Sequence, residues 1–424
     1  MDSSAHSPEN LEERLIFWSI VGTWGFYLLG ALYLLAPVLG WLLFALVAWR
    51  LFTGDYHRAP PLTVMLWCCG MLVMLLALVA GHLNWSLGAG QLIKSSIGWA
   101  KGWALLALFI LAGAVLRLRL TVIARAVNIL ALQTLLLVPL FLIAPHIGLP
   151  GRLYISPLSM LGGPGPEFFE VQLYAYGAGG EGLRWRFFSP WAPAAGMVAN
   201  VSLVLAMLDR RWLWKAIGVA AALAVCLLSQ SRLALVALLA VPVLVWLLAR
   251  LTRPIIWVGG AAGVTVAGIL ASPIMNAIVE GQARFSAARA ASSRVRAALG
   301  RIAVERWSNE APWFGHGVVE RGSHLVEYMP IGSHHTWYGL LFVKGMVGFA
   351  ALAAPMAASF IELLLKAQAS RTARAALAML LILLFYTFGE NLEVLVYLFW
   401  PGLLLIGKAS AQTLRSPFRH YLSG

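Results

Sequence analysis

The chain has 424 residues, of which 61% are hydrophobic and only 11% are charged, and its mean hydropathy is +0.81. No soluble globular domain needs this much apolar surface, so the composition indicates a polytopic membrane protein. The net charge of +14 does not indicate nucleic-acid binding, because the basic residues are scattered between apolar runs and form no continuous basic face.

About twelve apolar runs approach the length of roughly 20 residues that a helix needs to cross a bilayer. The polar N-terminus leads directly into the first run, which is typical of a permanent anchor and not of a cleaved signal peptide. The sequence therefore predicts an all-α fold of about twelve transmembrane helices. Their centres lie near residues 26, 44, 72, 106, 133, 200, 220, 241, 264, 350, 381 and 400.

The short connections between these runs set the orientation through their Lys and Arg residues. If the N-terminus is cytoplasmic, 17 of the 31 basic residues fall on the cytoplasmic side, almost all of them in short loops. The opposite short loops are nearly free of basic residues. We therefore expect both termini in the cytoplasm of a bacterial inner-membrane protein, and two long loops on the periplasmic face. The expected segments are 1–144 (five helices), 145–190 (loop), 191–272 (four helices), 273–335 (loop) and 336–424 (three helices and a cytoplasmic tail).

The first long loop, 145–190, is rich in Gly and Pro, which favours turns and extended pieces. Within it, Arg184 and Arg186 alternate with Trp185 and Phe187. One interpretation is an interfacial belt, with aromatic rings at the level of the headgroups and arginines on lipid phosphates. The other is a platform for sugar rings, with Arg184 and Arg186 binding substrate phosphate. Both interpretations stay open.

The second long loop, 273–335, contains seven arginines and no lysine. A helix is predicted over about 284–309, because Val295, Leu299 and Ile302 recur at helical spacing. This helix either lies on an anionic membrane surface, or presents arginines such as Arg294 and Arg301 to a diphosphate. Guanidinium suits the second role, since its planar fork binds phosphate oxygens bidentately and stays charged.

Two further features lie at predicted membrane edges. His334 and His335 stand immediately before a span, close to where the reactive end of a lipid-linked substrate would lie. Arg232 adjoins the start of another span, and an ionisable residue there snorkels, pairs or has a function. The three aspartates of the chain all fall at the N-terminus or in predicted cytoplasmic connections. Arginines must therefore supply any positive charge at the outer face, and no metal site or cofactor is expected.

Three segments in this order resemble the bacterial O-antigen ligase and polysaccharide polymerase superfamily. SRLAL at residues 231–235 resembles its Ser-Arg-x-Ala-Leu element, and SSR at 292–294 with PWFGHG at 312–317 resembles its Ser-Arg and Pro-x-x-Gly-x-Gly pattern. HHTW at 334–337 resembles its His-Asn-x-aromatic element, with His335 in place of the usual Asn. Either histidine is therefore a candidate base, although the spacing favours His334.

The resemblance implies a helical fold of the GT-C type and a metal-independent glycosyltransferase. It would move a glycan from an undecaprenyl-diphosphate carrier to an acceptor hydroxyl. In this interpretation His334 is the base and Arg232 and Arg294 contact the diphosphate. Neighbouring guanidinium charges should keep His334 neutral. Further substrate contacts are expected from Arg301, Arg186, Arg184, His335 and Trp337.

The motifs do not separate an O-antigen ligase, with lipid A-core as acceptor, from a polymerase of O-antigen, capsule or exopolysaccharide repeat units. We favour the ligase slightly. A chain-length regulator protein is an expected partner in the polymerase case. A flippase or exporter of lipid-linked sugars is the more distant alternative, and it predicts ionisable residues along a path through the membrane.

Overall fold

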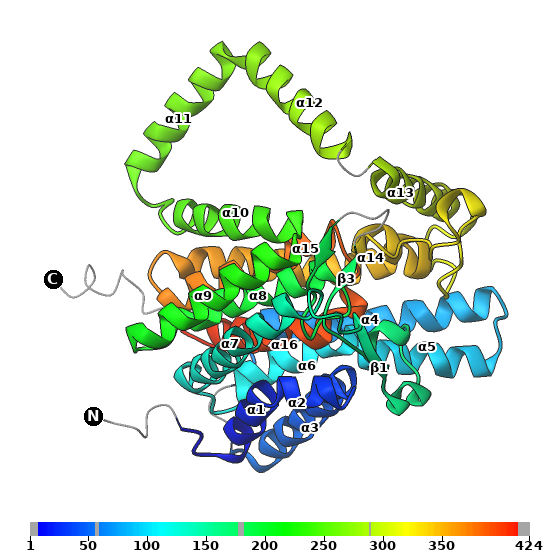
Figure 1. Cartoon of the computed structure of the whole chain (residues 1–424), viewed down its shortest axis with the longest axis horizontal. Helices are drawn as coiled ribbons and strands as arrows, with labels where there is room; N and C mark the ends of the chain where they lie inside the picture. The colour runs from blue at the N-terminus through cyan, green and yellow to red at the C-terminus, as the bar shows by residue number, and fades with distance from the viewer. Residues whose placement is uncertain (1–6, 56–58, 177–181, 288–289, 414–424) are drawn as a thin grey trace.

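A computed structural model describes residues 7–55, 59–176, 182–287 and 290–413. The fold is mostly helical, as expected (Figure 1). The α-helices are α1 (Leu11–Val21), α2 (Thr23–Leu28), α3 (Leu32–Thr53), α4 (Leu62–Asn84), α5 (Ala89–Lys101), α6 (Trp103–Val115), α7 (Leu120–Ile143), α8 (Ala192–Ala206), α9 (Trp212–Ser229), α10 (Arg232–Leu248), α11 (Pro254–Ile269), α12 (Ala271–Ala287), α13 (Ala290–Glu310), α14 (Thr336–Ala367), α15 (Arg371–Thr387) and α16 (Val396–Ser410). Short 3-10 helices are η2 (Pro157–Leu161), η3 (Pro166–Phe168), η5 (His324–Val326) and η6 (Leu392–Val394).

All twelve predicted centres fall inside α-helices, so the positions of the apolar runs are confirmed. Within the described residues, six helices are long and apolar enough to cross a membrane, or seven if the bent pair of α11 and α12 counts as one span. Three further apolar helices, α8, α10 and α16, are shorter. The chain is a multi-pass membrane protein, and the number of twelve spans stays a prediction.

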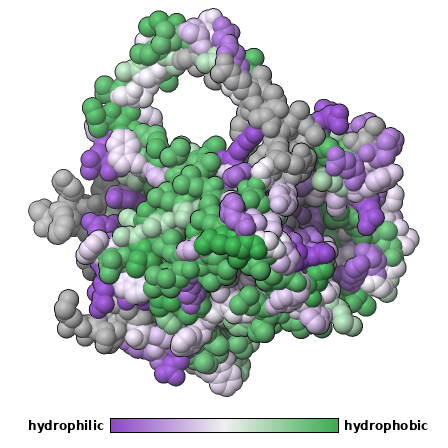
Figure 2. All heavy atoms as spheres, in the orientation of Figure 1, coloured by the Kyte–Doolittle hydropathy of each residue, from purple (hydrophilic) through white to green (hydrophobic). Residues whose placement is uncertain are grey.

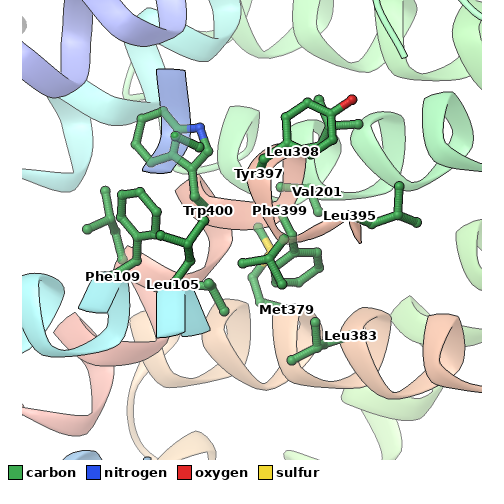
Figure 3. Packing of buried hydrophobic residues seen from close by; sticks show 14 of the residues in the cluster. Leu105, Phe109, Val201, Met379, Leu383, Leu395, Tyr397, Leu398, Phe399 and Trp400 are labelled. Carbon is green, nitrogen blue, oxygen red and sulfur yellow. The ribbon is translucent and has the colours of Figure 1, made fainter. Parts of the chain in front are cut away.

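Small residues let the central helices approach closely. A Cβ atom on Gly113 of α6 would lie 2.2 Å from the carbonyl oxygen of Leu404 on α16, and one on Gly407 would lie 1.9 Å from the carbonyl oxygen of Ile110. Close backbone approach of this kind is typical of helix packing in membranes. Large side chains fill the space around this contact. They include Phe109 and Trp400, whose rings stack with centroids 5.2 Å apart (Figure 3).

The segment 145–190 forms two small antiparallel hairpins, in agreement with the predicted turns and extended pieces. Strand β1 (Arg152–Ile155) pairs with β2 (Glu170–Gln172), and β3 (Ala175–Tyr176) pairs with β4 (Leu183–Arg184). In the space-filling view, hydrophobic residues cover much of the visible face of the helical body between hydrophilic groups on either side (Figure 2).

The segment 273–335 differs from the prediction at its start. Helix α13 covers most of the predicted helix over 284–309, and the described residues before it belong to α12, which already begins at Ala271. Pro273 does not prevent this, because the first turn of a helix tolerates proline. The axes of α11 and of α12 up to Gly281 meet at 82°. These two helices form an arch that rises above α10 (Figure 1), and no residue of α11 is buried.

Candidate active site

His334 lies directly before α14, and its ring is partly buried. Among the residues that the structure describes, neither ring nitrogen has a hydrogen-bond partner. Burial and, as the smaller cause, the nearby charge of Arg296 together lower the pKa of His334 to about 4. The imidazole is therefore neutral at physiological pH, the form that can accept a proton.

His335 has a different role. Its Nδ1 accepts a hydrogen bond from the backbone N–H of Tyr338 at 3.4 Å, so this side chain caps the N-terminus of α14. Its ring stacks on Tyr338 with centroids 3.9 Å apart. Asn is also a good N-cap, which explains how His335 can stand where the resembling family has Asn. Because the His335 side chain caps α14, His334 is the remaining candidate for the base.

Two residues beside His334 were not selected from the sequence. Arg296 on α13 acts electrostatically on both His334 and Glu390. Glu390, in the segment between α15 and α16, is 3% exposed and accepts a hydrogen bond from the indole N–H of Trp191 at 2.9 Å. Burial raises the pKa of Glu390 to about 7, against the opposing effects of Arg296 and the Trp191 hydrogen bond. An imidazole and a carboxyl with shifted pKa values therefore share one site with a guanidinium.

The predicted apolar stripe of α13 is confirmed, but it packs on protein. Val295 and Leu299 are buried against a cluster that includes Val326, Phe342 and Val343. Because successive residues of an α-helix are rotated by about 100°, Arg296 flanks this stripe, whereas Arg294 and Arg301 lie on the far side of α13. Both of these arginines are exposed. The structure does not bring them to His334 as it does Arg296.

Arg232 begins α10, and the side chain of the preceding residue, Ser231, caps that helix by accepting from the backbone N–H of Ala234 at 3.3 Å. The first turn of α10 lies beside the segment that carries Glu390, since a Cβ atom on Gly389 would be 2.8 Å from Leu233 Cδ2. This contact places the start of α10 next to the site, and the Arg232 side chain there is partly buried.

The remaining predicted contacts are already engaged in protein packing. Arg186 is buried and its Nη2 lies 2.8 Å from Glu170 Oε2, while Nη1 donates to the carbonyl of Pro190. Arg184 is partly buried at the end of β4. The indole N–H of Trp337 donates to Thr387 Oγ1 at 2.8 Å. The ion pair of Arg186 in particular gives it a structural role within the 145–190 loop.

The PWFGHG segment is inserted into the hydrogen-bond ladder of α14. In a regular helix the N–H groups of Met346 and Val347 would donate to the carbonyls of Phe342 and Val343. They donate instead to Pro312 and Trp313, at 2.9 and 3.1 Å. The freed carbonyls of Phe342 and Val343 accept from the N–H groups of His316 and Gly317, each at 2.9 Å. We call this exchange of four hydrogen bonds the α14 splice.

Glycine is required at the α14 splice. Gly345 has φ +64°, and a Cβ atom there would lie 2.3 Å from the backbone carbonyl of Trp313. Gly315 has φ +66°, and its Cβ atom would lie 2.4 Å from the backbone of Val343. Only glycine combines this left-handed backbone with so close an approach. The glycine motif thus fixes α13 on α14, which sets Arg296 beside His334.

His316 stabilises the same junction and does not face the site. Its ring is buried and stacks on Phe342 with centroids 4.3 Å apart, and Nε2 lies 2.7 Å from Glu310 Oε2. Arg306 binds the same carboxylate at 2.8 Å, and the two groups together lower the pKa of Glu310 to about 2, with Arg306 the larger cause. This network holds the end of α13 against α14.

Comparison with known families gives one match. Residues 217–353 match the family model described as O-antigen ligase. This part of the chain is similar to O-antigen ligases. It runs from within α9 to the middle of α14, and so contains Arg232, Arg296, the α14 splice and His334. A comparison with curated proteins found no match.

The family match confirms the resemblance to the O-antigen ligase and polysaccharide polymerase superfamily. It supports a membrane enzyme of glycosyltransferase type that acts on a lipid-linked glycan. Glu390 and Trp191 lie outside the matched residues. A sequence signal for Glu390 does exist, since a carboxylate at the end of an apolar span is unusual and marks a functional candidate.

Proposed function

We propose that this protein transfers a glycan from an undecaprenyl-diphosphate carrier to an acceptor hydroxyl at the periplasmic face of the inner membrane. The observation that carries the proposal is the neutral imidazole of His334, which lies with Arg296 in the part of the chain that matches the O-antigen ligase family. Glu390, from outside that part, lies beside them. We favour lipid A-core as the acceptor. Repeat-unit polymerisation of O-antigen, capsule or exopolysaccharide is the alternative within the same family.

In the proposed reaction His334 takes the proton of the acceptor hydroxyl. The acceptor oxygen forms a bond to the anomeric carbon, and the bond from that carbon to the diphosphate oxygen breaks, with its electron pair leaving on the diphosphate. The configuration at the anomeric carbon inverts, and no covalent enzyme intermediate forms. A positioned general base is typically worth roughly 10²–10⁴ in rate.

Negative charge develops on the leaving diphosphate, so fixed positive groups accelerate this step. Arg232 and Arg296 are the proposed contacts, because the start of α10 and the flank of α13 lie next to the site. Arg294 and Arg301 lie on the far side of α13 and are exposed, so we assign them no contact with the leaving diphosphate. Glu390, when ionised, would stabilise the imidazolium that forms on His334.

The test is glycan transfer by purified protein in detergent, with undecaprenyl-diphosphate glycan as donor, lipid A-core as acceptor and EDTA present. Wild type is compared with His334→Ala and Arg232→Ala. Product formed by wild type and lost in both variants supports the ligase with the proposed roles. Elongation of the lipid-linked glycan without transfer to lipid A-core would establish a polymerase. Homogeneous protein that is inactive with both acceptors would refute transfer and favour transport.

A further inference from the structure

Lys344 is a buried ammonium inside α14, one residue before the break at Gly345. The residue is 2% exposed, and among the described residues no atom accepts a hydrogen bond from its Nζ. The carboxylate of Glu393 lies 3.9 Å away, and the ring centroid of Trp103 lies 5.7 Å away. An ammonium inside a membrane protein is costly without a compensating charge. Glu393 is that charge, and the pair lies outside the groups used in the proposed reaction.

Glu393 belongs to the same short segment as Glu390. This segment, residues 389–395, joins α15 to α16 and is attached to α14 at two points. Near its start, Thr336 Oγ1 donates to the carbonyl of Glu390 at 2.7 Å and accepts from the N–H of Leu392 at 3.0 Å. Farther along, Glu393 reaches Lys344, two turns deeper in α14. The first attachment holds the backbone near Glu390, and the second holds the part of the segment that follows it.

The start of α6 closes the other side of the segment. A Cβ atom on Gly102 would lie 2.6 Å from the carbonyl oxygen of Glu393 and 2.8 Å from its Cγ. The backbone at Glu393 is therefore packed between α6 and α14. If the segment shifted along α14, the Lys344 ammonium would lose its counter-charge in an apolar interior. An ion pair thus gives this contact a register that an apolar contact would not impose.

We propose that Lys344 and Glu393 are positioning residues, which hold the 389–395 segment so that Glu390 faces His334 and Arg296. This inference rests on the proposed transferase function, and neither side chain contacts the reacting groups. It also accounts for the place of Lys344 in the chain. Lys344 is the last residue before the break at Gly345, so its ammonium lies at the negative end of the dipole of the first part of α14.

The experiment removes both charges at once with Lys344→Met and Glu393→Gln in one protein, which leaves no buried charge unpaired. Hydrogen–deuterium exchange of residues 388–395 and steady-state kinetics are measured on the same preparation. We expect exchange in this segment to become about tenfold faster or more. We expect kcat to fall roughly 10²-fold, since a displacement of about 1 Å can have this effect, with the KM for the lipid donor within about threefold of wild type.

The matched control removes a second Lys–Glu pair of α14, Lys366→Met with Glu362→Gln, whose Nζ and Oε1 atoms lie 2.7 Å apart. This pair contacts α4 and α16, far along α14 from His334. The control should leave both kcat and the exchange of residues 388–395 unchanged. If the double variant at the site does not fold, Lys344→Met alone is used. Glu393 then keeps some access to water, its side chain being 24% exposed.

Unchanged exchange in residues 388–395, or a wild-type kcat in the folded variant, would overturn the positioning role. The same loss of kcat in the Lys366 and Glu362 control would also overturn it, since the effect would then be general to α14. A wild-type protein that transfers glycan to neither acceptor refutes the proposed function instead. The exchange measurement does not depend on activity, so the two failures are distinguished.

Discussion

Exchange of Arg296 for Gln tests the electrostatics of the site most directly. Arg294, two residues earlier, is also an exposed arginine of α13 but lies away from the buried stripe. Arg294→Gln is therefore a matched control for helix propensity and net charge. We expect Arg296→Gln to lower kcat/KM by about 10²–10³, the typical effect of removing one group that stabilises developing charge. That factor corresponds to about 3–4 kcal/mol. Arg294→Gln should stay within about threefold of wild type, as surface substitutions usually do.

The same substitution should change the pH profile in a defined direction. Burial is the larger cause of the fall of the His334 pKa from 6.5 to about 4, so Arg296 accounts for less than half of it. Arg296→Gln should therefore raise the pKa of His334, because it removes the smaller of the two causes that lower it. His334 remains neutral at pH 7 in both proteins. The loss of rate at pH 7 thus reports on the leaving group, while the acidic limb of kcat/KM moves to higher pH.

The assay is glycan transfer between pH 4 and 8 with donor and acceptor varied separately. Removal of Arg296 should also raise the pKa of Glu390 above about 7, because the guanidinium charge now lowers it. A large loss of rate in Arg294→Gln, with near-normal rates in Arg296→Gln, would refute the assignment of Arg296. An acidic limb that does not move would refute the electrostatic contact between Arg296 and His334.

Three further comparisons test the assignments around the site. His335→Asn should retain the cap of α14 and keep the transfer rate within about threefold of wild type. His334→Asn should lower kcat by roughly 10²–10⁴. Similar losses in both variants would contradict the division of roles. Gly345→Ala should destabilise the fold by about 2–5 kcal/mol through the left-handed backbone and the clash at the α14 splice. Its melting temperature is compared with that of Gly98→Ala, whose Cβ meets open space. Burial raises the pKa of Glu390, so its ionisation destabilises the fold as pH rises from about 4.5 to about 7. Glu390→Gln should gain about 3 kcal/mol relative to wild type at pH 8 and nothing at pH 4; equal effects at the two pH values would contradict the buried carboxyl.

The sequence alone predicts those features of the fold that depend on the local pattern of apolar residues. The apolar runs predict the positions of the helices, and the spacing of Val295, Leu299 and Ile302 predicts the buried stripe of α13. Glycines modify the lengths of the runs, because Gly22 and Gly102 each end one helix and begin another. An apolar run has the same hydropathy whether it forms one long helix or two shorter ones. The apolar pattern alone therefore does not show such breaks.

The site depends on contacts between distant segments, and these were only partly predictable. The spacing identified His334, and a neutral imidazole was expected from neighbouring guanidinium groups. The structure assigns most of that pKa shift to burial, and only the rest to Arg296. Helical periodicity separates Arg296 from Arg294 around α13, but it does not show which of the two sides lies next to His334. The choice is made by the packing of α13 on α14.

Glu390 follows His334 by 56 positions in the printed sequence, and only the fold shows that they share a site. The Pro-x-x-Gly-x-Gly pattern was recognised in the sequence as one that resembles the superfamily, but its structural role was not. The sequence did not show that its glycines allow the backbone hydrogen bonds with α14. His316, inside that motif, is engaged in stacking and in the contact with Glu310.

The α14 splice has a consequence for how this protein is assembled in the membrane. The N–H groups of Met346 and Val347 obtain their acceptors from residues 312 and 313, which precede the helix and are synthesised before it. Unsatisfied backbone groups in hydrocarbon cost several kcal/mol each. A nascent α14 entering the bilayer alone would therefore begin as an unbroken helix, with Gly345 in the right-handed conformation. Maturation would then require a local exchange of hydrogen-bond partners, and residues 312–317 would join α14 in that late step and not during insertion.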